Sequence, residues 1–497
     1  MSKDGALAVF PLAFLLSSPA QPVDGGTHPS NIHIRPTAMN IPEFPPRFRL
    51  PHPILFFLSA MLLAAQAVSA PTAKPNILIF FVDDMGWAQP GCYGGKMAPT
   101  PNIDALAAGG VRFTDGYSSG CICSPGRVGL LTGRYQARTG HDANPQKAGR
   151  ELLLTETTIA QRLKSVGYTT GIVGKWHLGD TSAEFLPLAR GFDFAVGSVG
   201  NLGEGKGPSF YRGAQKVEDL PGAPITSPVY AREAISFIER SKYRPWFLDL
   251  SFNAVHAPHV ASPKWLEKFK SLPRHDQQYA ALVAEADEAI GDVMAKLREL
   301  KQEENTLIFL ISDNGGAYAN AEMGGLRGHK WFVWEGGVRV SWIAAWKGRV
   351  PGGRVSHEPV IQLDVLPTAL AAAGAETKPE WQLDGVNLLP LLEGKADKLA
   401  PRELYFRFGV QHAVRSGDWK LVKASLKMES MLVNLAQDPG EQKDLSAEQP
   451  EKKKELQALF DKWSAEMKPP RWQDERWNGD ENRKDVKQER RKGKTAE

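Results

Sequence analysis

KPNILIFFVDDMG, residues 74–86, contains an unbroken apolar run from Ile77 to Val82 that stops at two aspartates. An apolar run of this length, rich in β-branched and aromatic residues, is typical of a strand that is buried on both faces, as in a parallel sheet covered by helices. A second run of this kind, TLIFLIS at residues 306–312, stops at an aspartate and an asparagine. The two runs predict two buried strands that each end in polar residues.

Helical patterns alternate with the strand-like runs. The stretch TETTIAQRLKSVGY predicts a helix capped by Thr155 and leads into the strand-like TTGIVG, and a longer helix is predicted from Gln277 to Glu303. Strands that alternate with helices predict an α/β fold with a large, mostly parallel central sheet between helices. Because ligands of such sheets bind beyond the carboxyl ends of the strands, we expect the polar residues after the two runs to meet at one edge.

The sequence pattern changes near Arg402, where short strand-like runs separated by turns replace the long apolar runs. These runs predict a smaller C-terminal α+β subdomain with a short antiparallel sheet, followed by an amphipathic helix from Pro450 to Met467. We therefore expect four segments. They are an N-terminal extension with a signal peptide (1–70), a main domain (71–400), the antiparallel-sheet subdomain (401–469) and a charged, flexible tail (470–497).

A secretory signal is predicted ahead of the first strand. The apolar run Ile54–Ala65 follows Arg47 and Arg49 and precedes the small residues Val68–Ala70, which is the order of regions in a signal peptide. We expect cleavage after Ala70, export to the periplasm or the medium, and no membrane span in the mature chain. An uncleaved anchor is the alternative, and Met39 in place of Met1 is an alternative start.

Composition and charge exclude some classes of function. The 60 basic and 56 acidic residues give a formal charge of only +4, so the sequence predicts no nucleic-acid partner. The glycine-rich lysine motif of P-loop proteins is absent from the sequence, which excludes that class of phosphate-transferring protein.

The cysteines are odd in number for an exported chain: Cys92, Cys121 and Cys123. A disulfide between Cys92 and Cys121 would leave Cys123 unpaired, and an unpaired thiol outside the cytoplasm needs a reason. The stretch after it, SPGRVGLLTGR, predicts a helix that begins just beyond Cys123. A helix N-terminus attracts anions and lowers the pKa of a thiol. The alternative is a small buried cysteine at a helix start.

The polar residues after the two apolar runs are Asp83, Asp84, Asp313 and Asn314. Carboxylate and amide oxygens are the ligands that Ca²⁺ and Mg²⁺ prefer, and we favour calcium because it tolerates irregular oxygen cages. For a single pair of this kind the alternative is a turn that merely ends a strand. Two pairs at the ends of two buried strands favour the metal site.

The stretch CSPGRVGLLTGR resembles the signature of the type I sulfatases, which belong to the alkaline-phosphatase-like superfamily. Gly126 is a mild departure, since that slot more often holds Ser, Thr or Ala. Further stretches resemble the same family in the expected order, over roughly Lys74–Met467: PNILIFFVDDMGW, GCYGG, TPNIDALAAGGVRFTDGY, GIVGKWHLG, LSFNAVHAPH, LIFLISDNGG, LRGHKWFVWEGGVRV and LVNLAQDPGEQKDL.

The resemblance implies a modified nucleophile. In this family the cysteine of the signature, here Cys123, is oxidised by a formylglycine-generating enzyme to formylglycine, whose hydrated form attacks sulfur and then expels sulfate as the aldehyde re-forms. The resemblance also implies one calcium ion per chain, held together with the modified Cys123 by the residues Asp83, Asp84, Asp313 and Asn314.

The resemblance assigns roles to five more residues. Arg127 and Lys175 would stabilise the charged hydrate, and His177 would take a proton from its second hydroxyl. His256 and Lys330 would contact the sulfate and assist the leaving oxygen. A cation and several cationic side chains around a sulfate ester would offset the charge that builds up during transfer.

The sequence therefore predicts an exported sulfatase whose substrate is a sulfated small molecule or, by preference, a sulfated glycan. A phosphonate monoester or phosphodiester hydrolase of the same superfamily and an inactive sulfated-glycan-binding protein remain as alternatives. His141 and Asp142 either reach the substrate or form a loop turn. We expect the segment from Val196 to Val229 and the tail with Trp472 and Trp477 to shape the mouth of the pocket.

Overall fold

The computed structural model describes residues 74–145, 149–203, 209–317 and 320–479. The predicted signal peptide and both candidate start residues lie outside these ranges, so the signal, its cleavage and export stay predictions. Among the helices in the described ranges, none combines the length and the apolar character needed to cross a bilayer.

A ten-stranded sheet forms the centre of the fold, in the order β11-β2-β10-β9-β1-β8-β4-β5-β6-β7. The predicted strands at its centre are confirmed as β1 (Asn76–Val82) and β9 (Thr306–Ser312). Of the ten, only β10 and β6 run against the others, so the sheet is mostly parallel, as the sequence predicts. The remaining strands are β2 (Val111–Phe113), β4 (Thr169–Gly174), β5 (Phe194–Ser198), β6 (Phe210–Arg212), β7 (Gln215–Val217), β8 (Trp246–Ser251), β10 (Trp342–Ala345) and β11 (Arg354–Ser356).

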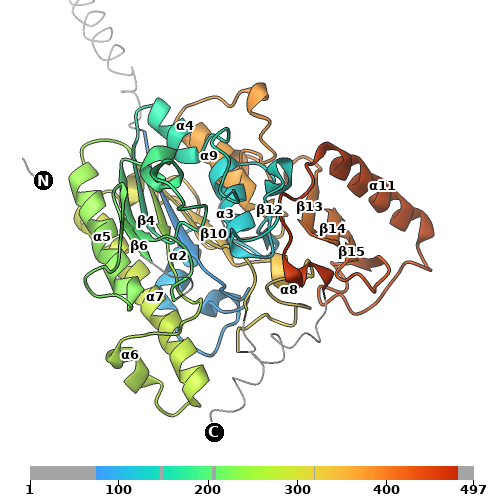
Figure 1. Ribbon diagram of the computed structural model, residues 1–497, viewed down its shortest axis with the longest axis horizontal. Helices are drawn as coiled ribbons and strands as arrows, with labels where there is room; N and C mark the ends of the chain where they lie inside the picture. The colour runs from blue at the N-terminus through green and yellow to red at the C-terminus, as the bar shows by residue number, and fades with distance from the viewer. Residues whose placement is uncertain (1–73, 146–148, 204–208, 318–319, 480–497) are drawn as a thin grey trace, which may run out of the picture. The chain divides into compact units, whose positions relative to one another are not determined.

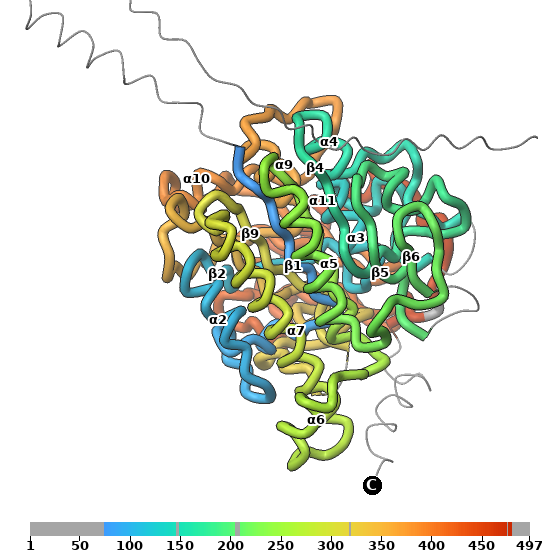
Figure 2. The backbone as a smooth tube through the Cα atoms, turned by 90° about the vertical axis from the view of Figure 1, so that its left-hand side faces the viewer, coloured from blue at the N-terminus to red at the C-terminus, as the bar shows by residue number. Residues whose placement is uncertain are grey.

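Helices cover both faces of this sheet (Figure 1). Alternate side chains of β1 point to opposite faces. Leu78, Phe80 and Val82 belong to a core shared with α2, α5 and α7, and Ile77, Ile79 and Phe81 belong to a second core shared with α3, α4 and α9. The 90° view shows α5 and α7 in front of β1 (Figure 2). The helices are α2 (Pro101–Ala108), α3 (Cys123–Thr132), α4 (Ile159–Ser165), α5 (Thr226–Ser241), α6 (Pro263–Lys268), α7 (Arg274–Glu299), α9 (Val365–Ala372) and α10 (Leu389–Leu392).

Two predicted helix boundaries are wrong by a few residues. Helix α4 is capped by Thr158 and not by Thr155: the Thr158 side chain accepts a hydrogen bond from the backbone N–H of Gln161, whose side chain caps Thr158 in return. The reciprocal pair satisfies two backbone donors at once, which a cap three residues earlier would not do. The long helix α7 begins at Arg274, directly after Pro273.

The C-terminal subdomain is a four-stranded antiparallel sheet covered by one helix, as the sequence predicts. Its strands are β13 (Glu403–Phe408), β14 (Gln411–Ser416), β15 (Trp419–Lys423) and β16 (Met431–Asn434), and its helix is α11 (Pro450–Glu466). Its core continues into the short helix α8 (Glu335–Val338) of the main domain. A two-stranded pair, β3 (Gly116–Tyr117) with β12 (Val360–Ile361), stands apart from both sheets.

A buried ion cluster joins this subdomain to the main domain. Lys420 on β15 is completely buried, and its Nζ lies 2.8 Å from Oε1 of Glu335 and 2.9 Å from Oε1 of Glu441. Glu335 begins α8, and its backbone N–H donates to the Glu441 carboxylate. One ammonium group therefore bridges two buried carboxylates from opposite sides of the boundary.

We expect Lys420→Met to destabilise the fold by about 3–5 kcal/mol, because it leaves the buried Glu441 without its counter-charge and leaves Glu335 with Arg339 as its paired cation. Burial raises the pKa of Glu441 to about 7 even with Lys420 in place. Loss of Lys420 raises this pKa further, so the loss of stability is largest at pH 8 and smaller at pH 5, where the Glu441 carboxyl holds a proton. Urea unfolding at the two pH values measures this difference. Lys423→Met on the same strand, which removes a partly exposed lysine, should change stability by less than about 0.5 kcal/mol. An equal loss in both variants would contradict the role given to the ion cluster.

Candidate active site

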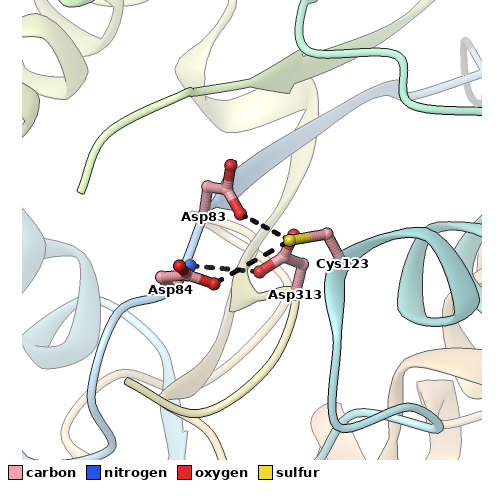
Figure 3. A group of neighbouring side chains, drawn as sticks. All are labelled: Asp83, Asp84, Cys123 and Asp313. Carbon is pink, nitrogen blue, oxygen red and sulfur yellow. Dashed lines mark hydrogen bonds between the residues drawn. The ribbon is translucent and has the colours of Figure 1, made fainter. Parts of the chain in front are cut away.

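Three aspartates and one cysteine meet at the carboxyl edge of the central sheet. Val82 pairs with Ser312 across β1 and β9, so the residues that follow the two strands emerge side by side. One ligand atom from each of Asp83, Asp84, Asp313 and Cys123 lies within 4.8 Å of the others, and all four residues are buried. Their side chains point toward one another (Figure 3). This grouping confirms that the two strand ends meet at one edge, and it could hold a metal ion.

Cys123 is the first residue of α3, and not a residue just ahead of it as the sequence suggested. Its Sγ donates to Asp83 Oδ1 at 3.3 Å and lies 3.9 Å from Asp84 Oδ1. The expectation of a lowered thiol pKa is wrong for this arrangement, because burial and the neighbouring Asp83 carboxylate raise the pKa of Cys123. Helix α3 also packs close to the second strand end, since a Cβ atom at Gly126 would lie 2.5 Å from the carbonyl oxygen of Asp313.

The carboxylates are crowded enough to favour a cation among them. Burial and the charge of Asp83 raise the pKa of Asp313 to about 7. Asn314 donates from Nδ2 to Asp84 Oδ1 at 2.7 Å, while its Oδ1 is buried and accepts no hydrogen bond in the described part of the chain. A buried carbonyl oxygen without a donor beside three carboxylates fits the hard ligand set of Ca²⁺ or Mg²⁺.

Three cationic side chains surround this cluster, each paired with one of its aspartates. Arg127 lies 2.8 Å from Asp313, Lys330 lies 2.7 Å from Asp84, and the Lys175 ammonium group contacts Asp83. Burial alone would raise the pKa of Asp83, but Lys175, His256, Arg127 and Lys330 together hold it well below its usual range. The site therefore keeps Asp83 ionised even though solvent does not reach it.

The two predicted histidines are buried among the cationic groups, and both have lowered pKa values. Burial, and then the charges of Lys175 and Arg127, lower the pKa of His177, and its buried Nδ1 has no hydrogen-bond partner in the described ranges. Burial, and then the charge of Lys330, lower the pKa of His256, whose Nε2 lies 3.6 Å from Asp84 Oδ2. Both imidazoles are therefore neutral near pH 7.

Arg127 is held by groups that sequence reasoning missed. Its Nη1 donates to the carbonyl oxygen of Lys175 at 2.9 Å and to Ser251 Oγ at 3.2 Å, and Ser251 Oγ in turn donates to Asp249 at 3.0 Å. Asp249 is buried in β8, and burial raises its pKa to about 6. Sequence reasoning gave no role to Asp249, or to Ser251 although it lies in the stretch LSFNAVHAPH, because their role depends on two parallel strands placing them beside a helix.

A cavity of about 510 Å³ opens above the site. His177, His256 and Lys330 line it, so three of the predicted catalytic residues face one cavity. The other lining residues are Asn144, Pro145, Asn201, Leu202, Gly203, Ala257, Pro258, Ala317, Trp331 and Arg476. The segment from Val196 to Val229 thus contributes three lining residues, as expected.

The two predicted tryptophans do not line this cavity. Trp472 is buried against the ring of His141, at 4.8 Å between centroids, and Trp477 packs against Phe408 at 6.3 Å. Both rings fasten the C-terminal segment to the rest of the protein, while Arg476, between them in sequence, is the residue of this segment that reaches the cavity.

His141 and Asp142 also have structural roles and do not line the cavity. Asp142 pairs with Arg407 at 2.7 Å. His141 lies between Ser124 of the signature helix, at 2.7 Å from Nε2, and Arg471 of the C-terminal segment, at 3.2 Å from Nδ1. Since arginine can only donate, Nδ1 is the acceptor and the proton sits on Nε2.

The pairing of Cys92 with Cys121 is wrong: all three cysteines are free thiols. Cys92 packs against the core shared by α2, α5 and α7, whereas Cys121 belongs to the core of the C-terminal subdomain. The two side chains are therefore built into different parts of the fold.

Comparison with known proteins adds a family to this geometry. A family model described as Sulfatase matches residues 75–375, and a second, described as the C-terminal part of N-sulphoglucosamine sulphohydrolase, matches residues 327–468. The chain is 37% identical over 399 residues to the N-acetylgalactosamine-6-sulfatase of Canis lupus familiaris, covering 74% of each protein. It is 35% identical over 402 residues to the arylsulfatase A of Homo sapiens, covering 73% of this chain and 77% of the relative.

A solved structure shows the same fold. The crystal structure of Ps i-CgsB in complex with k-i-k-neocarrahexaose superposes with a TM-score of 0.74 at 28% identity, covering 85% of this chain and 98% of that one. This likeness agrees with the fold predicted from the sequence.

The contribution of His141 to stability should depend on pH. Burial and Arg471 lower the pKa of His141 to about 3, below the unfolded value of about 6.5. Its stabilising contribution is therefore complete above pH 6.5 and is lost as the pH falls, by about 1.4 kcal/mol per pH unit. We expect the difference in unfolding free energy between the wild type and His141→Gln to shrink from pH 7 to pH 5 in urea titrations. A difference that stays constant over this range would contradict the neutral, buried state of His141.

Proposed function

The chain belongs to the sulfatase family and is a sulfuric ester hydrolase, and on this premise we propose that it releases sulfate from a sulfated glycan, using Cys123 after conversion to formylglycine beside one calcium ion. The observation that carries the proposal is the position of Cys123, at the first turn of α3 and within reach of three buried aspartates.

Two observations support a glycan as the substrate. The cavity above the site is large, and its lining is rich in groups that hydrogen bond, among them Asn144, Asn201 and His256. The relatives point the same way, because one is an N-acetylgalactosamine-6-sulfatase and one solved structure holds k-i-k-neocarrahexaose.

The signal-like run at residues 54–65 supports an exported enzyme, which meets polymers outside the cytoplasm.

Conversion of Cys123 would explain the otherwise unused thiol. The motif CSPGR is intact at residues 123–127, which supports a formylglycine-generating enzyme as a partner during maturation. As a thiol, Cys123 is a poor nucleophile, because its raised pKa keeps it protonated. Formylglycine would supply a hydrated aldehyde whose hydroxyl can attack sulfur and whose carbonyl can re-form to expel sulfate.

The donor set fits calcium. Asp83, Asp84, Asp313 and the Asn314 side-chain oxygen, with the modified Cys123, would hold it, and the unpartnered Asn314 Oδ1 and the raised pKa of Asp313 are both relieved by a cation at that place. When bound, the ion supplies positive charge that offsets the negative charge of the reacting sulfate.

The chain's own cations provide the rest of the positive field. Lys175 and Arg127 approach the cluster on the Asp83 and Asp313 side, where they would stabilise negative charge on the oxygen of residue 123. Lys330 and His256 line the cavity, where they would contact the sulfate and assist the departing alcohol oxygen. His177, neutral and without a partner on Nδ1, is suited to accept a proton at a ring nitrogen.

The calcium proposal is testable without turnover. Calcium should raise the unfolding free energy by about 2.7 kcal/mol at about 100 times its dissociation constant, since it binds only the folded cluster. Asp313→Asn should lose most of this stabilisation, measured by thermal unfolding with and without calcium and by calorimetric titration. Asp249→Asn is the matched control, because it removes a buried carboxylate from the neighbouring strand β8 that does not belong to the cluster. Equal calcium responses in the two variants would argue against the site.

The modification and the reaction are tested together. In a host with the converting enzyme, peptide mass spectrometry should find formylglycine at position 123, and the protein should release sulfate from nitrophenyl sulfate and from sulfated oligosaccharides. Cys123→Ala should lower turnover by more than about a thousandfold, because the nucleophile is lost. Turnover of a nitrophenyl phosphodiester in preference to the sulfate would favour a phosphodiester hydrolase instead. A fully converted protein that turns over neither ester would contradict the proposed function.

A further inference from the structure

The cavity wall contains a side-chain amide whose orientation is fixed. Asn144 lines the cavity together with His177, His256 and Lys330. Its Oδ1 accepts a hydrogen bond from the backbone N–H of Ser124 at 3.0 Å. Because a backbone N–H can only donate, the oxygen of the carboxamide faces Ser124 and the nitrogen points away from it. The hydrogen bond to α3 therefore sets the direction in which Asn144 Nδ2 points.

The same hydrogen bond places Asn144 beside the residue that we propose as the nucleophile. The nitrogen of Ser124 belongs to the peptide bond with Cys123, which is the first residue of α3 (Figure 3). In the proposed reaction the sulfur of the bound ester has to lie about 3 Å from the attacking oxygen of residue 123. The Asn144 carboxamide therefore borders the space that the sulfate group occupies.

The segment that carries Asn144 is held by further contacts. Trp472 Nε1 donates to the backbone carbonyl oxygen of Asn144 at 3.2 Å. Three residues earlier, His141 Nε2 lies 2.7 Å from Ser124 Oγ, and the His141 ring packs against Trp472 at 4.8 Å between centroids. These contacts restrict the backbone on both sides of the amide before a substrate arrives, so less conformational entropy is lost when it binds.

The nitrogen of this amide has no partner within the protein. Asn144 is half-buried, and among the described residues its Nδ2 makes no hydrogen bond. Nor is Nδ2 one of the buried unpartnered atoms of those ranges, so it is accessible from the cavity that Asn144 lines. The cations nearby are already paired, Lys330 with Asp84 and Arg127 with Asp313. Asn144 Nδ2 therefore adds an uncommitted donor to a site built for an anion.

We propose that Asn144 is a further substrate-binding residue of this site, and that its Nδ2 donates a hydrogen bond to a non-bridging oxygen of the sulfate group that is released. The inference rests on the proposed function and deepens it, because it assigns a neutral donor to the sulfate besides Lys330 and His256. The sulfate oxygens only accept hydrogen bonds and carry the charge of the ester, so the contact is charge-assisted.

Two substitutions separate the donor from the helix cap. Asn144→Asp keeps an oxygen for the Ser124 N–H but replaces the N–H donor by a carboxylate oxygen that repels sulfate, whereas Asn144→Ala removes both groups. Rates on nitrophenyl sulfate are normalised to the fraction of formylglycine at position 123, found by peptide mass spectrometry. We expect kcat/KM to fall by about ten- to a hundredfold in Asn144→Ala and at least as far in Asn144→Asp. An Asn144→Asp protein with the wild-type rate would show that Asn144 only caps α3 and would overturn the proposal.

A second substrate separates the sulfate from the sugar. Nitrophenyl sulfate has no sugar hydroxyl, so a contact with the sulfate predicts the same fold-loss on this ester and on a sulfated oligosaccharide. A loss confined to the oligosaccharide would indicate a contact with a hydroxyl and would overturn the proposal. Asn387→Asp is the matched control: Asn387 Oδ1 accepts from the backbone N–H of Leu389 at 2.9 Å at the start of α10, and Asn387 does not line the cavity. This variant should leave both rates unchanged.

A binding measurement keeps this inference distinguishable from the proposed function. In the calcium-loaded Cys123→Ala protein, calorimetric titration with inorganic sulfate should give a Kd that Asn144→Asp raises by about tenfold and that Asn387→Asp leaves unchanged. Weaker sulfate binding in Asn144→Asp, with no ester turnover by the converted protein, would support the role of Asn144 and overturn the enzymatic proposal. Ester turnover that Asn144→Asp leaves unchanged, with an unchanged Kd for sulfate, would do the reverse.

Discussion

The structure of the site depends on negative charge that is buried where two parallel strands end. Asp83, Asp84 and Asp313 are removed from solvent by the same packing that makes β1 and β9 the centre of the sheet. Burying an isolated carboxylate costs free energy, so each of the three forms an ion pair with a cation: Lys175, Lys330 or Arg127. The positive charges that suit a sulfate ester are therefore needed in the first place for this edge of the sheet to fold.

Much of the fold could be predicted because its signals are local. The continuous apolar runs at β1 and β9 and the aspartates after them are readable without tertiary information, and the change of pattern near Arg402 marks the small sheet. The errors arose where the outcome depends on contacts between distant segments. The thiol pKa of Cys123 follows from burial beside Asp83 and not from the helix terminus alone, and the cysteines stay unpaired because they pack in different cores.

The sequence predicted the candidate site about as far as it predicted the fold. Residues in recognisable motifs come together, and three of them line one cavity. Asp249 and Arg476 carried no sequence signal, because each interacts with a residue more than a hundred positions away: Asp249 with Arg127 and Arg476 with Trp331. The expectation that tryptophans near the C-terminus shape the cavity failed for the same reason, since both rings serve as packing and the arginine between them reaches the opening.

The ion cluster of Glu335, Lys420 and Glu441 limits how this chain can be recombined with its relatives. Its members are drawn from both sides of the boundary near residue 400, and Lys420 is completely enclosed between them. A chimera that joins this main domain to the C-terminal sheet of a sulfatase without the counterparts of Lys420 and Glu441 would bury Glu335 without its Lys420 partner. The main domain and the C-terminal subdomain therefore have to be exchanged together, even though each has its own sheet.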